Sequence, residues 1–135
     1  RLVFINNYEI QMPPKNLAFY CALLKLHLEG YQKDQCPVGF MSAFDMTEGS
    51  LDSIFLNLYK KILGANSTYV ERELEQTSLV EIEWIKQTRS KINKSFHDNV
   101  PPLIYNFCSI SSTGPYGETS YGIDTKAKNI NLKQR

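Results

Sequence analysis

Two proline pairs, Pro13-Pro14 and Pro101-Pro102, divide the 135-residue chain into three stretches with different apolar periodicity. Proline interrupts both helices and central strands, so each pair marks a change of structure. Before the first pair, two short apolar runs flank Asn6-Asn7, residues that tolerate positive φ, and this pattern predicts a β-hairpin over 2–11. After the second pair the period falls to two residues, which predicts a strand over 104–110.

The stretch between the proline pairs has helical periodicity. A first helix is predicted over 15–29, with Pro13-Pro14 at its start and Gly30 at its end. A second is predicted over 51–63, capped by Ser50 and ended by Gly64. Residues 31–49 show no sustained period and are expected to form a long connection with Phe40 and Phe44 as apolar anchors.

A third helix is predicted from Ser78, which forms a capping-box pattern with Glu81, to Asn99. Its expected buried stripe consists of four apolar residues: Ile82, Ile85, Ile92 and Phe96. Beyond the strand over 104–110 we expect a Gly/Pro loop over 111–119, a second strand over 120–124 and a short third one within 129–132.

A strand pair, three helices and a terminal hairpin make up the element order of a winged helix. We therefore predict an α+β fold with an N-terminal β-hairpin, a three-helix core and a C-terminal β-hairpin wing. Residues 1–135 are expected to form one such domain. Sixteen aromatic residues and a hydrophobic fraction of 42% exclude an intrinsically disordered chain.

The net charge of +1 hides an asymmetry between the two parts of the chain. Residues 1–85 contain seven Lys and Arg against eleven Asp and Glu, whereas residues 86–135 contain eight against three. A segregated basic region is typical of surfaces that contact phosphates or an acidic partner, although a solvated face has the same composition.

The chain lacks an apolar run of membrane-spanning length, and no membrane partner is expected. Three cysteines at Cys21, Cys36 and Cys108 fit neither a zinc knuckle nor a CxxC pair, which favours a reducing, cytoplasmic setting, with a single bridge left open. The sequence begins without Met or a secretory leader, so we expect it to be the C-terminal part of a longer protein.

Three segments carry a resemblance to known winged helices. Met12 to Tyr20 resembles the start of OmpR-type winged helices, while Ser90 to Phe96 and Thr119 to Ile123 look like their recognition helix and return strand. Together with the segment from Asn106 to Gly114, they are similar to the C-terminal winged-helix region of a CRISPR-associated, CARF-linked protein family. The resemblance implies a cytoplasmic, homodimeric, non-enzymatic output domain of an antiviral defence protein, with a nucleotide-sensing domain upstream.

The third predicted helix and the wing supply the candidate residues for binding duplex DNA or RNA. Basic side chains there can neutralise phosphates, Ser90 and Asn93 have the chemistry to reach base edges, and an aromatic wing tip can lie against a groove. Asn93 could equally hold the helix to the wing. The candidate nucleic-acid-binding residues are Lys86, Arg89, Ser90, Lys91, Asn93, Lys94, His97 and Tyr116.

No catalytic constellation, metal site or cofactor is predicted. His27 and His97 have no ligand at a metal-binding spacing, and no motif supports a nucleophilic pair of Cys108 and His97. The alternative function is a protein-interaction or dimerisation module without nucleic-acid binding. In that interpretation Tyr31, Phe40, Phe44 and Tyr69 form an exposed apolar patch.

Overall fold

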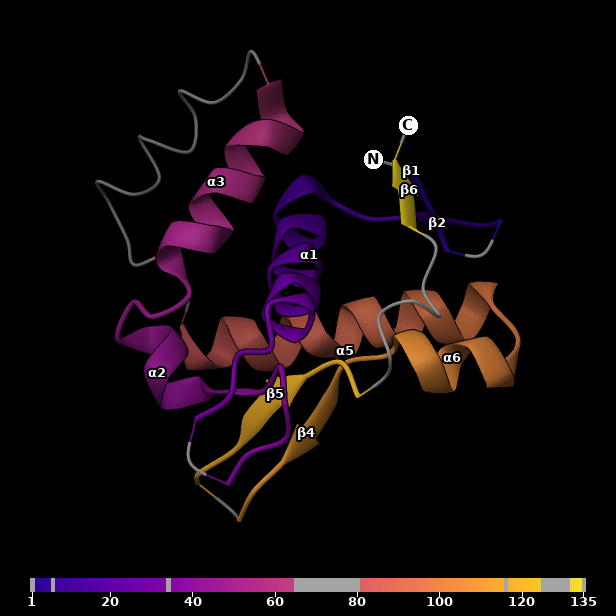
Figure 1. The fold of residues 1–135 in the computed structure, drawn as a ribbon. Coiled ribbons are helices and arrows are strands. Elements are labelled where there is room, and N and C mark those ends of the chain that lie inside the picture. Colours follow the sequence, from indigo (N-terminus) through magenta and orange to yellow (C-terminus); the bar gives the residue numbers. More distant parts are fainter. Residues whose placement is uncertain are drawn as a thin grey trace.

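The computed structural model of the chain has a mixed α+β fold and describes residues 2–5, 7–33, 35–64, 81–115, 117–124 and 132–134 (Figure 1). These residues form five helices and two three-stranded sheets. In chain order the elements are β1 (Leu2–Ile5), β2 (Tyr8–Gln11), α1 (Pro14–Leu28), β3 (Met41–Ser42), α2 (Ala43–Thr47), α3 (Asp52–Leu63), α5 (Ile82–Asn99), α6 (Pro102–Cys108), β4 (Ser111–Thr113), β5 (Ser120–Gly122) and β6 (Leu132–Gln134).

The first sheet has the strand order β2-β1-β6 and joins the two ends of the chain. Strands β1 and β2 form the predicted hairpin, and Asn7 adopts a φ of 74° at its turn. Strand β6 pairs antiparallel with β1, so Ile5 lies opposite Leu132. Residues 129–131 of the short third strand that the sequence predicts lie outside the described residues.

The second sheet has the strand order β3-β5-β4, with all neighbours antiparallel. Strand β3 lies within the predicted connection over 31–49, so that prediction is wrong for 41–47, where β3 and α2 form. Gly122 on β5 approaches Phe40 so closely that an added Cβ would lie 2.6 Å from the ring. Phe40 therefore packs under this sheet as a buried anchor, as predicted, whereas Phe44 remains 68% exposed.

Helix α1 lies at the centre of the core and packs against α3 and α5 (Figure 1). The rings of Phe19, Phe55 and Trp84 meet edge to face or tilted, with centroids 5.2 to 6.4 Å apart. Tyr20 packs edge-on against Phe96 at 5.1 Å, and its hydroxyl donates a buried hydrogen bond of 2.8 Å to the Cys108 carbonyl. The fully buried rings of Phe19, Phe55 and Phe96 each stabilise the fold by about 1.5–3 kcal/mol through removal of apolar surface from water, whereas Trp84 is only partly buried.

The predicted strand over 104–110 is wrong, because residues 102–108 form helix α6. The first strand of the hairpin is β4 at 111–113, so the predicted loop over 111–119 is wrong for those three residues. Pro102 occupies the first turn, where a missing amide costs nothing, and the Tyr105 amide donates to the Pro101 carbonyl at 2.9 Å. In so short a segment the apolar residues fit both the two-residue period of a strand and the 3.6-residue period of a helix. In the helix Cys108 is buried, Ile104 one turn earlier is half-buried, and Leu103 is exposed.

One predicted helix start and one predicted helix cap are also wrong. Glu81 has the extended angles φ −117° and ψ 155°, so α5 begins at Ile82 and not after Ser78, which lies outside the described residues. Ile82 is consequently 48% exposed, while Ile85, Ile92 and Phe96 are buried as predicted. Helix α3 begins after Leu51 without a side-chain cap, so the predicted Ser50 cap does not form.

None of the helices in the described residues combines the length and apolar composition needed to cross a bilayer.

Candidate nucleic-acid interface

Helix α5 contains seven of the eight predicted nucleic-acid-binding residues, and the eighth, Tyr116, lies outside the described residues. The helix is 18 residues long and buries Ile85, Thr88, Ile92 and Phe96 against the core. Of the other sides of the helix, one faces the β4–β5 hairpin and one faces solvent. The predicted residues therefore fall into two groups.

Arg89 and Asn93 form the flank of α5 that faces the β4–β5 hairpin. The Asn93 side-chain amide donates to the Ile110 carbonyl at 2.9 Å, and its oxygen accepts from the Ile110 amide at 2.8 Å. Arg89 Nε donates to the same carbonyl at 3.1 Å, and its guanidinium lies 5.8 Å from the centre of the Tyr121 ring. Ile110 immediately precedes β4 and Tyr121 lies on β5, so this hairpin-facing flank ties α5 to both strands.

The geometry therefore places Asn93 in the role of holding the helix to the hairpin. Both of its polar groups are occupied by one backbone position 17 residues away. An asparagine amide that reads an adenine uses the same two groups. Base reading by Asn93 would thus require both bonds to Ile110 to break.

Lys86, Ser90, Lys94 and His97 are exposed and recur at i, i+4, i+8 and i+11, which places them in one stripe along α5. We call these four residues the outer stripe. Lys91 is also exposed and lies about 60° further around the helix from Lys94. With Arg89 on the hairpin-facing flank, the outer face of α5 holds three lysines and the two carboxylates of Glu83 and Asp98, so its formal charge is about +1.

The ion pairs of the outer stripe lie in solvent. Lys94 Nζ lies 2.9 Å from Asp98, Lys86 Nζ lies 3.9 Å from Glu83, and His97 Nδ1 lies 3.5 Å from Asp98. The Lys94 hydrogen bond, followed by that from His97, lowers the pKa of the Asp98 carboxyl. Exposed pairs of this kind contribute little to stability, so the lysines can exchange these partners for phosphates at small cost.

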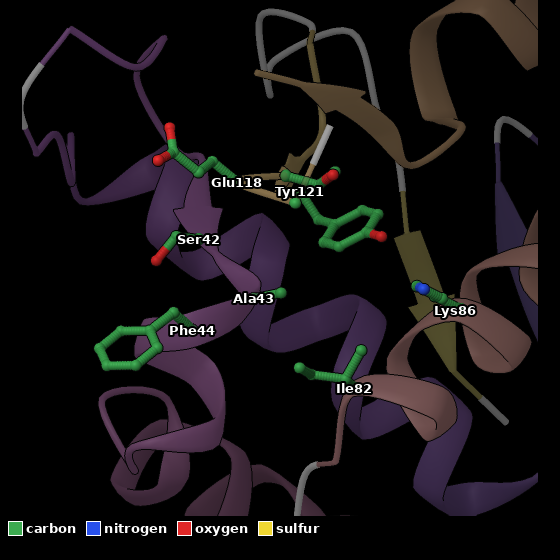
Figure 2. A pocket seen from close by; sticks show the side chains of 9 residues that line it. Ser42, Ala43, Phe44, Ile82, Lys86, Glu118 and Tyr121 are labelled. Atoms are coloured by element: carbon green, nitrogen blue, oxygen red, sulfur yellow. The ribbon is translucent and has the colours of Figure 1, made fainter. Parts of the chain in front are cut away.

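The outer stripe is bounded at both ends by other elements. Near the start of α5, Lys86 and Tyr121 line a common groove beside the hairpin (Figure 2). At the other end, the His97 ring meets Tyr105 of α6 edge-on at 5.9 Å. A ligand lying along the outer stripe would therefore meet the hairpin on one side and α6 at its far end.

The cysteines and histidines form no site in the part of the chain that the structure describes. All three cysteines are free thiols, and burial raises the pKa of Cys21 to about 11 and that of Cys108 to about 12. Thiols with such pKa values stay protonated near neutral pH and are poor nucleophiles. No cluster of three metal-ligating side chains occurs among the described residues.

The apolar patch predicted for the alternative function does not form with its predicted members. Phe40 is only 2% exposed, Tyr31 is half-buried, and Tyr69 lies outside the described residues. Sequence reasoning missed Ile82, which is exposed and lines the same groove as Phe44, because helical spacing placed it in the buried stripe. No signal in the sequence marks the extended residue Glu81 that turns Ile82 outward.

No known protein family, no curated protein and no solved structure matches this chain. The arrangement of α5, the hairpin and the groove is therefore the basis for a functional proposal.

Proposed function

We propose that the chain is a winged-helix module that binds duplex DNA or RNA through the outer stripe of α5 and the β4–β5 hairpin. The order of elements supports this arrangement: helix α1, strand β3, helices α2, α3 and α5, then a hairpin whose strand β5 pairs with β3. The β1–β2 hairpin before α1 belongs to the predicted element order, whereas helix α6 and strand β6 are additions to it. The motif resemblance adds a biological setting, that of an output domain in a CRISPR-associated defence protein.

The observation that carries the proposal is the position of the outer stripe next to a hairpin to which α5 is fixed. From Lys86 to His97 the stripe is about 16 Å long, and a helix about 10–12 Å across fits a major groove about 12 Å wide. The three bonds from Arg89 and Asn93 to Ile110 hold the hairpin at a defined side of that helix. A fixed helix and hairpin can contact phosphates on both sides of one groove.

The predicted residues take different roles in this proposal. Lys86, Lys91 and Lys94 neutralise phosphates, and Ser90 donates a hydrogen bond to a phosphate or a base edge. His97 adds a positive charge only when protonated. Arg89 and Asn93 are positioning residues that set the angle of the hairpin.

The same proposal includes a homodimer and an upstream nucleotide-sensing domain. A change of dimer geometry would alter the distance between two outer stripes, and with it the affinity for a duplex whose grooves repeat at a fixed spacing. The chain needs no cofactor or catalytic residue for this role.

The test is fluorescence anisotropy with a random-sequence duplex at about 50 mM and about 200 mM salt. The wild type should bind, and more weakly at the higher salt concentration. The stripe variant Lys86→Glu with Lys94→Glu should lose at least about tenfold in affinity, since it reverses two phosphate contacts. A control with the same charge change, Lys25→Glu with Lys61→Glu, alters exposed lysines on α1 and α3 and should bind like the wild type.

Two results would overturn the proposal. One is no detectable wild-type affinity at the lower salt concentration. The other is an equal loss in the stripe variant and the control, which would assign binding to net charge and not to the outer stripe. Circular dichroism and thermal unfolding of each variant show that a lost affinity does not come from unfolding.

A further inference from the structure

A groove with a volume of about 710 Å³ lies between the start of α2, the start of α5 and the end of the β4–β5 hairpin (Figure 2). Its volume lies within the range of about 300–1,000 Å³ that is usual for binding sites. Helix α2 contributes Ala43 and Phe44, α5 contributes Ile82 and Lys86, and the hairpin contributes Glu118 and Tyr121. The nucleic-acid proposal uses Lys86 and the hairpin that carries Glu118 and Tyr121, and it gives no role to Ala43, Phe44 or Ile82.

Apolar side chains of the groove are exposed although they are large. Phe44 is 68% exposed and Ile82 is 48% exposed, and neither belongs to the core. Ala43 and Tyr121 extend the apolar lining between the two helices and the sheet (Figure 2). Exposed apolar side chains that line one groove with a polar rim are typical of protein-interaction sites.

The charged groups of the groove differ in sign and come from opposite walls. Lys86 lies on the α5 side and Glu118 on the hairpin side, with the Tyr121 ring between them in the view of Figure 2. Lys86 Nζ is 3.9 Å from Glu83, at the limit of an ion pair, so it can still bind an acidic group of a ligand. A phosphate backbone along this groove would meet the Glu118 carboxylate, which disfavours nucleic acid as the occupant.

We propose that this groove binds an extended peptide segment of a partner protein, in which a large apolar side chain stands between a basic and an acidic residue. The apolar side chain would pack against Phe44 and Ile82. The acidic residue would pair with Lys86 and the basic residue with Glu118, which fixes the direction of the peptide. This site shares Lys86 with the outer stripe, but it stands whether or not the outer stripe binds nucleic acid.

The first experiment selects random short peptides displayed on phage against the wild type, with counter-selection against Ile82→Glu. The enriched peptides should share a large apolar residue with a basic residue on one side and an acidic residue on the other. Absence of enrichment, or enriched peptides without this pattern, would overturn the proposal.

The second experiment measures the anisotropy of one enriched, fluorescein-labelled peptide. Ile82→Glu and Phe44→Ser should each weaken binding by more than about tenfold, as expected for central apolar contacts. Lys86→Glu should weaken binding too, and a peptide with its acidic residue changed to lysine should recover affinity for Lys86→Glu only. An unfolded variant cannot show this charge-swap recovery. Leu28→Ser, a matched change at a 66% exposed residue on α1, should bind like the wild type.

A third measurement tests whether the groove is occupied by a second copy of the chain instead of a peptide from another protein. Light scattering of the wild type and Ile82→Glu should give the same mass at each concentration. A wild-type dimer that Ile82→Glu converts to a monomer would overturn the proposal and assign the groove to self-association.

Discussion

The two polar flanks of α5 carry similar residue types and have different surroundings. On the hairpin-facing flank, Arg89 and Asn93 make three hydrogen bonds of 2.8 to 3.1 Å to the backbone of Ile110. On the outer stripe, Lys86 and Lys94 lie in solvent and pair with carboxylates of their own helix. The comparison shows that a basic or amide residue on a helix acquires its role from the direction it faces, and that residue type alone does not decide between structure and binding.

A substitution on the buried face of α5 should lower the free energy of unfolding more than a substitution on either polar flank. Phe96 is fully buried and packs against Tyr20, so Phe96→Ala should lower the free energy of unfolding by about 3–5 kcal/mol through lost apolar contact and a remaining cavity. Urea denaturation followed by tryptophan fluorescence measures the change. A loss below about 1 kcal/mol would show that α5 does not pack on α1 as described.

The hairpin-facing flank should give the next largest effect. Asn93→Ala removes both partners that Asn93 offers to Ile110 and should cost about 1–3 kcal/mol in the free energy of unfolding. Ser90→Ala, at an exposed position of the same helix, is the matched control and should cost less than about 0.5 kcal/mol. Equal urea midpoints for the two variants would show that the hairpin-facing flank contributes no more to stability than the outer stripe does.

A substitution in the outer stripe should change the free energy of unfolding least, but it should clearly change the pKa of Asp98. In the folded state Lys94 and His97 lower the pKa of Asp98, so their stabilising contribution is present above the unfolded pKa of about 3.9 and disappears as the pH falls through the lower folded value. In Lys94→Met the pKa of Asp98, followed by carboxyl NMR, should rise toward its ordinary value while the urea midpoint at neutral pH stays unchanged. An unchanged Asp98 pKa would mean that the Lys94 contact does not persist in solution.

Local patterns in the sequence were sufficient for the elements that depend on them. The hairpin at Asn7, helix α1 with Gly30 after it, and the buried positions of Ile85 and Ile92 are confirmed. Each follows from a turn residue or from apolar spacing over several helical turns, which does not require knowledge of distant parts of the chain.

The elements that were not predicted depend on short segments or distant contacts. Helix α6 has seven residues, too few for period two to be distinguished from helical spacing, and β3 has two residues and exists only by pairing with β5. Phe44 and Ile82 line one groove because α2 and α5 meet there, a contact between elements far apart in the chain. For Asn93 the sequence allowed two roles, and the bonds to Ile110 depend on where α6 returns the chain.

The most direct test of the two-flank account is amide NMR of the ¹⁵N-labelled chain during titration with a random-sequence duplex. Lys86, Ser90, Lys94 and His97 should show the largest shift changes on α5, together with the β4–β5 hairpin, while the side-chain amide signals of Asn93 stay in place because they remain bonded to Ile110. Shift changes centred on the exposed face of α3, or displacement of the Asn93 side-chain signals as the duplex binds, would contradict the account.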